Sequence, residues 1–224
     1  GRYREAAALY AAALRIVEHR LPVGHPDRLT VMGNLAVALM NTSELDAADT
    51  LAREVLRQSI QASPSGDGSA SAYSRVGNIE AIRGRSHQAE VAFRAGLDIL
   101  RRTVDPDHDL ITSEMRNVGV AVARQGRVAE GFALVDSAHR RALAKHGPNT
   151  RATAYLNGQR GYLLLWLGRT REAETALRSA SAVLEAIAAD PGSRSTIEYW
   201  RGILELRRGN PSEAVARMSS AREM

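Results

Sequence analysis

One pattern recurs along this chain every 41 or 42 residues, and it restricts the possible folds more than any other feature of the sequence. A glycine marks each copy except the second, where a serine takes its place. The marker positions are Gly1, Ser43, Gly84, Gly126, Gly168 and Gly209. A period of this length indicates a stack of similar supersecondary units, because such a unit buries its apolar face only against its neighbours.

Three further columns keep the same register around the marker. A small residue stands seven positions before it, another five positions after it, and a mostly larger apolar residue nine positions after it. Two antiparallel helices approach closely only where side chains are small, so we expect the larger residue to fill the gap left between them. In order, the columns are Ala36, Gly77, Gly119, Gly161 and Gly202; Ala6, Ala48, Ala89, Gly131, Ala173 and Ala214; and Tyr10, Ala52, Phe93, Val135, Leu177 and Met218.

The spacing of apolar residues predicts a helix on each side of the marker. Leu29, Met32 and Leu35 are separated by three positions, a spacing that places them on one helix face. The marker then lies between two helices, where a residue with free backbone angles lets the chain reverse tightly. Proline and glycine concentrate in the longer joints between units, and no segment has the alternating pattern of a strand. The predicted fold is therefore all-α.

Two smaller features concern how helices begin. Ser195 and Glu198 have the spacing of a capping box at the start of the last helix pair. His25, His108 and His146 lie in joints between units beside Pro, Asp or Gly, and we interpret them as helix-start residues.

The repeated columns and one motif near the start of the chain resemble a known family. The motif Gly-x-Tyr-x-x-Ala-x-x-x-Tyr-x-x-Ala, from Gly1 to Ala13, is similar to the tetratricopeptide repeat, whose usual length is about 34 residues. The longer period resembles the kinesin-light-chain subtype, as do the segments 32–36 (Met-Gly-Asn-Leu-Ala) and 115–119 (Met-Arg-Asn-Val-Gly). The resemblance covers essentially the whole chain. It implies an α-solenoid, a right-handed superhelix of antiparallel helix pairs, as found in bacterial multidomain regulators.

The period sets the expected boundaries. We expect a single array over 1–224 that starts with the second helix of a truncated repeat, 1–24, and continues with five repeats. These are 25–66, 67–108, 109–149, 150–191 and 192–224. The first helix would present Leu9, Ala13 and Ile16 with no partner before it, so we expect further repeats or a second copy of the chain to cover that face.

The resemblance also implies a concave wall lined by the first helix of each pair. Residues at fixed offsets before the marker then form a candidate peptide-binding groove: amides that can bond an extended backbone, arginines that can pair with acidic groups, and aromatic anchors. They are Asn34, Arg75, Asn78, Arg116, Asn117, Arg124, Gln159, Tyr162, Trp166, Tyr199 and Arg207, with Trp200 beside them. The plainer alternative is that the two Trp are core residues, the amides bond neighbouring helices and the arginines are solvated.

Other function classes find no support. The chain has no Cys, its six His show no zinc-ligand spacing, and Asp105, Asp107 and Asp109 lack the Gly and Glu of a calcium loop, so we expect no metal, no cofactor and no enzyme. The net charge of +5 is scattered along the chain, which disfavours nucleic acid. No apolar run is long enough to cross a membrane, the longest being Ala6 to Leu14 with nine residues, and no signal peptide is apparent, so we expect a cytoplasmic protein. All basic residues but Lys145 are Arg, and Ala is abundant, which is typical of a GC-rich bacterial genome.

The leading prediction is a scaffold for a protein or an extended peptide, acidic peptides included. It would form one part of a larger signalling protein. A first alternative is a self-associating or autoregulatory spacer, attached to a catalytic domain such as a Ser/Thr kinase or a regulatory ATPase, with a homodimer through the first helix. A second alternative is a sensor of a short signalling peptide.

Overall fold

A computed structural model describes residues 2–64 and 66–224, so the marker Gly1 lies outside the described residues. The described residues form eleven α-helices and no strand, which confirms the all-α prediction. The helices are α1 (Arg2–Arg20), α2 (Pro26–Asn41), α3 (Leu45–Ala62), α4 (Asp67–Ile82), α5 (Ser86–Thr103), α6 (Asp109–Arg124), α7 (Val128–His146), α8 (Arg151–Trp166), α9 (Thr170–Ala186), α10 (Pro191–Arg207) and α11 (Pro211–Glu223).

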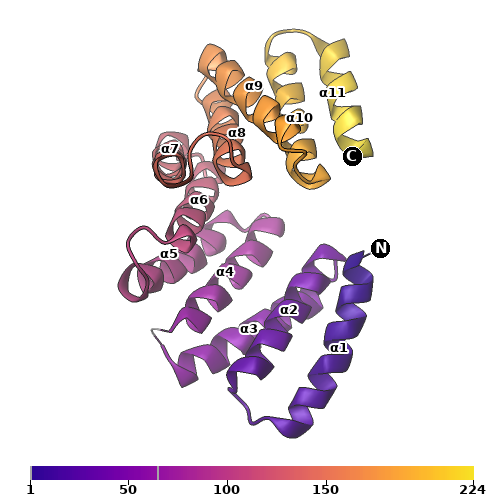
Figure 1. Cartoon of the computed structure of the whole chain (residues 1–224), viewed down its shortest axis with the longest axis vertical. Coiled ribbons are helices and arrows are strands. Elements are labelled where there is room, and N and C mark those ends of the chain that lie inside the picture. The colour runs from indigo at the N-terminus through magenta and orange to yellow at the C-terminus, as the bar shows by residue number, and fades with distance from the viewer. Residues whose placement is uncertain (1, 65) are drawn as a thin grey trace. The chain divides into compact units, whose positions relative to one another are not determined.

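The chain divides into two compact units, Gly1–Glu114 and Met115–Met224, and α6 runs from the first into the second. Within the first unit, α1 to α5 pack in chain order, each against the next (Figure 1). Within the second unit, α7 to α11 do the same. Because the connections within each pair are only a few residues long, consecutive helices run antiparallel.

The marker residues reverse the chain as the sequence predicts. Four marker glycines have positive φ: Gly84 (75°), Gly126 (87°), Gly168 (74°) and Gly209 (80°). Ser43 adopts the same left-handed conformation, with φ of 67°, although its Cβ makes that conformation cost about 1 kcal/mol or more. The backbone angle at this position is therefore kept even where the glycine is not.

The predicted columns meet inside each helix pair. A Cβ added at Gly77 would lie 2.5 Å from the ring of Phe93, and one added at Gly161 would lie 2.9 Å from Leu177. The same close approach occurs between Gly119 and Val135 and between Gly202 and Met218. A Cβ at Gly131 would be 2.4 Å from the carbonyl oxygen of Gly119, so α6 and α7 are in backbone contact there. These contacts confirm the packing predicted from the columns.

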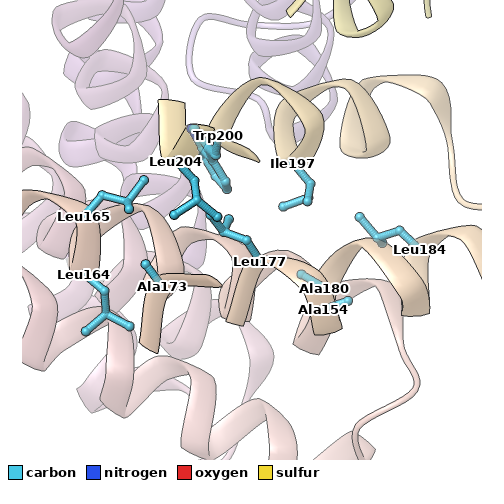
Figure 2. Packing of buried hydrophobic residues seen from close by; sticks show 10 residues of the cluster. All are labelled: Ala154, Leu164, Leu165, Ala173, Leu177, Ala180, Leu184, Ile197, Trp200 and Leu204. Atoms are coloured by element: carbon cyan, nitrogen blue, oxygen red, sulfur yellow. The ribbon is translucent and has the colours of Figure 1, made fainter. Parts of the chain in front are cut away.

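The core of the second unit is aliphatic around one large ring (Figure 2). Leu177 and Leu184 of α9 pack against Ile197 and Leu204 of α10, and Trp200 of α10 lies in the same cluster with 8% of its surface exposed. Since each fully buried aliphatic side chain contributes about 1.5–3 kcal/mol, this cluster fixes α8, α9 and α10 to one another.

The structure contradicts one expectation about helix starts. Helix α10 begins at Pro191, and Asp190 is its N-cap, accepting from the backbone N–H of Ser193 at 2.9 Å. Ser195 instead donates to the carbonyl of Ala221 at 2.7 Å, and Glu198 binds arginines, so the predicted capping box is wrong. The carbonyl of Ala221 on α11 accepts the hydrogen bond of the Ser195 hydroxyl, which the sequence spacing assigns to the N-cap.

Two of the three joint histidines do act at helix starts. Nδ1 of His25, the N-cap of α2, accepts from the backbone N–H of Asp27, and Nδ1 of His108 accepts from that of Leu110, both at 3.2 Å.

No helix in the described part of the chain is both long enough and apolar enough to cross a bilayer.

Candidate functional site

Eight of the eleven candidate groove residues fall in the second unit, where aromatic side chains gather on α8 and α10. Tyr155, Tyr162 and Trp166 lie on one face of α8, since they are spaced by seven and four positions. On α10, Tyr199 and Leu206 lie one turn to either side of Ile203, which packs against the same cluster as Tyr155 and Tyr162. These six residues are called the aromatic surface below.

Ring contacts hold the aromatic surface in place. Tyr162 stacks on Trp200 with a centroid distance of 5.3 Å and an interplanar angle of 8°, and it meets the edge of Trp166 at 5.3 Å. Tyr155 contacts the other side of the cluster, tilted against Trp200 at 5.9 Å. Each such pair contributes about 0.5–1.5 kcal/mol beyond burial, so the exposed ring of Trp166 stands on a fixed base.

The two tryptophans of the sequence therefore have different roles. Trp200 belongs to the core, as the plainer alternative held. Trp166 is 38% exposed and Tyr199 is 50% exposed, so both offer apolar area to a ligand. Large, rigid side chains that remain accessible at low entropic cost are the usual anchors of protein recognition.

Polar groups adjoin the rings. The guanidinium of Arg116 lies 5.8 Å from the centroid of the Tyr155 ring and donates to Oδ1 of Asn117 at 2.6 Å. Oε1 of Gln159, which lies between Tyr155 and Tyr162 along the α8 face, is buried without a hydrogen-bond partner among the described residues. Arg124 and Arg207 are exposed at the last turns of α6 and α10.

The remaining three candidates lie in the first unit. Asn34 of α2 and Asn78 of α4 are half-buried, and neither amide makes a hydrogen bond to another described residue. Arg75 of α4 is also half-buried, and burial lowers the pKa of its guanidinium. The assignment of these three residues to a peptide-binding groove stays a prediction.

Comparison with known proteins identifies the repeat. The family model described as tetratricopeptide repeat matches residues 28–57 and 69–109. The chain thus contains tetratricopeptide repeats in these two segments. This confirms the resemblance drawn from the period and the columns. A comparison with curated proteins found no significant match.

Solved structures share the fold of this repeat protein. BtubC (BKLC) from P. vanneervenii aligns with a TM-score of 0.74 at 16% identity, covering 100% of this chain and 91% of its own. A putative kinesin light chain of Podosopora anserina gives 0.67 at 16%, covering 84% and 89%. PlcR of Bacillus thuringiensis, solved with the peptide PapR7 and DNA, gives 0.67 at 18%, covering 91% and 68%. These likenesses confirm the helical-repeat class, and a putative kinesin light chain is among the similar structures.

Sequence reasoning missed two members of the aromatic surface. Tyr155 stands four positions before Gln159 and seven before Tyr162, so the helical spacing of the candidates already pointed to it. Leu206, which is 51% exposed, adjoins the candidate Arg207. Neither residue lies at one of the offsets that the family resemblance implies, whereas the helix face includes both.

No group of three or more His, Asp or Glu among the described residues is arranged to hold a metal ion. On α1, Leu9 is 72% exposed and Ile16 55% exposed, so the face expected to need a cover is accessible in a single copy of the repeat protein. The homodimer through this helix stays a prediction.

Proposed function

We propose that this repeat protein is a non-enzymatic scaffold that binds an extended peptide segment of a partner on the aromatic surface. The observation that carries the proposal is the exposure of Trp166 and Tyr199 beside a ring stack fixed by the core. The arginines beside this surface, Arg116 and Arg207, favour a peptide that carries acidic side chains.

The relatives support the general class. PlcR was solved with a peptide, and YrrB, another similar structure, is described as having a peptide-binding site, so helical repeats of this fold hold peptides. We extend this to a role as one part of a larger bacterial, cytoplasmic signalling protein, in line with the sequence analysis. Regulation of a linked kinase or ATPase is the form that such a role would take.

Peptide display against the full chain tests the proposal. A library of acidic and neutral peptides is selected on the wild-type protein, and the selected peptides are measured by isothermal titration calorimetry. We expect the double variant Trp166→Ala with Tyr199→Ala to weaken binding at least tenfold, because each exposed ring is an anchor worth more than about 1 kcal/mol. Arg207→Ala should reduce affinity for acidic peptides only.

The matched control removes exposed apolar side chains elsewhere in the second unit. Leu143 of α7 and Val215 of α11 are 39% and 63% exposed, and their replacement by Ala should leave peptide affinity unchanged. The proposal fails if the control variant loses affinity as the aromatic variant does, or if Trp166 and Tyr199 can be removed without effect. Circular dichroism of each variant shows whether the fold is retained.

A further inference from the structure

A pocket of about 370 Å³ lies in the first unit, between α2, α3 and α4, and none of its lining residues belongs to the aromatic surface. Its wall includes the apolar residues Leu29, Val55 and Ala62 and several hydroxyl groups, among them those of Ser59 and Ser71. This volume is at the lower end of the range for small-molecule sites, about 300–1,000 Å³. The pocket therefore suits a small molecule better than a folded partner.

Among the described lining residues of this pocket, the charged one is Arg75. Its guanidinium lies against α2, so that a Cβ added at Gly33 would be 2.8 Å from Cζ of Arg75. No carboxylate and no hydrogen-bond acceptor is recorded for it among the described residues, and no lining residue described is acidic.

Several other partly buried guanidinium groups in this protein are paired with a carboxylate. Arg28 meets Glu18 at 3.5 Å, Arg83 meets Asp49 at 3.2 Å, and Arg201 meets Glu198 at 2.7 Å. Removing a cation from water is costly unless a counter-charge or hydrogen bonds replace the lost hydration. Arg75 is half-buried at the wall of a pocket and has no partner among the described residues. An anion that enters the pocket from solution would supply its counter-charge.

We propose that this pocket binds a small organic anion, whose charged group pairs with Arg75 and whose apolar part lies against Leu29, Val55 and Ala62. The charge of the pocket selects an anion, and the apolar wall selects one with a hydrocarbon body over an inorganic ion. The site is independent of the aromatic surface, so either proposal can fail without the other.

A series of short acyl carboxylates tests the ligand class. Butanoate, hexanoate and octanoate, each compared with its neutral amide, are titrated into the full chain and followed by isothermal titration calorimetry and by backbone amide shifts. We expect the affinity of the acids to rise with the length of the acyl chain. The affinity of each neutral amide should be at least about tenfold lower than that of its acid, because a charge-assisted pair is lost. The backbone amide signals that shift should belong to residues of α2, α3 and α4.

Variants locate the contacts. Arg75→Gln should weaken octanoate binding about tenfold while leaving the amide unaffected, and Ser71→Phe, at an exposed lining position, should block both. Arg101→Gln, which removes an exposed arginine of α5, is the control and should bind as the wild type does. Thermal melts of all variants verify folding.

Four results would overturn the proposal. The first is the absence of saturable binding by every acid in the series. The second is equal affinity for acid and amide, which would remove the role of the charge. The third is inorganic phosphate binding as tightly as octanoate, which would reduce the pocket to a simple anion site. The fourth is unchanged octanoate affinity in folded Arg75→Gln.

Discussion

Glu198 of α10 is a carboxylate whose burial and partners act in opposite directions. Burial raises its pKa, but hydrogen bonds from Arg201, Ser181 and Arg217, together with the charge of Arg201, outweigh burial, and the pKa is lowered overall. Arg201 donates at 2.7 Å and Arg217 at 3.0 Å, so this one residue joins α10 to α11. Ser181 of α9 donates to the same carboxylate, which brings a third helix into the network.

Replacing Glu198 by Gln should destabilise the protein by about 2 kcal/mol at pH 7, since hydrogen bonds to a charged group are lost. A lowered pKa means that the carboxylate's contribution is complete above the unfolded-state value near 4.5 and is lost as pH falls through the folded-state value. The stability gap between wild type and variant should therefore narrow below pH 4.5 in urea titrations. Glu213→Gln, which removes an exposed partner of Arg217, should cost only a few tenths of a kcal/mol. A gap that is constant from pH 7 to pH 3 would contradict this account.

A second residue-scale prediction concerns Asp190, the N-cap of α10. The backbone N–H and hydroxyl of Ser193 and the guanidinium of Arg151 lower its pKa to about 2. Asp190→Ala should lower the free energy of unfolding by about 1 kcal/mol, whereas Asp190→Asn should retain most of the cap. The contribution of the aspartate should be lost only as pH falls from near 3.8 through about 2. Thermal melts of the two variants should differ at pH 7, and equal melts would show that the cap contributes nothing.

At the scale of the helix, the backbone contact between α6 and α7 sets how close the pair can come. Gly131→Ala places a methyl group 2.4 Å from the Gly119 carbonyl, where no side chain can give way, so the helices must separate. We expect a loss of about 1–3 kcal/mol, despite the better helix propensity of Ala. Gly192→Ala in α10 is the control: its nearest contact would be at 3.4 Å, and it should be neutral or slightly stabilising. In urea unfolding, the free energy of unfolding of Gly131→Ala should be below that of the wild type, and that of Gly192→Ala should be equal to it or slightly above it.

Helices and their packing were largely predictable, while the site was predictable only in part. Gly161 and Leu177 could be paired from the sequence because every copy repeats the same contact. Trp166 and Trp200 could not be separated, because the exposure of each ring depends on which neighbours stack on it. The unpaired state of Arg75 was also out of reach, because it depends on which acidic groups lie near it in space.

At the scale of the whole molecule, both Trp residues lie in the unit Met115–Met224, so their fluorescence reports on that unit, whereas far-UV ellipticity reports on both. A repeat array is stabilised by contacts between neighbours, so damage in one part need not spread evenly. Gly77→Val, which forces a side chain against Phe93 in the first unit, should lower the urea midpoint of ellipticity more than that of fluorescence. Gly131→Ala should lower the fluorescence midpoint. Identical shifts of both signals in both variants would show that the array unfolds as one cooperative body.

The left-handed turn between paired helices has a consequence for how such a chain can change in length. Ser43 and the four described glycines place the same backbone angle at the same point of each copy, so the joint does not depend on what the neighbouring copies contain. A stretch cut from one marker to the next is thus a cassette with matching ends. Duplication or deletion of such a cassette would lengthen or shorten the array without forcing a new joint, and selection could then adjust its exposed residues one copy at a time.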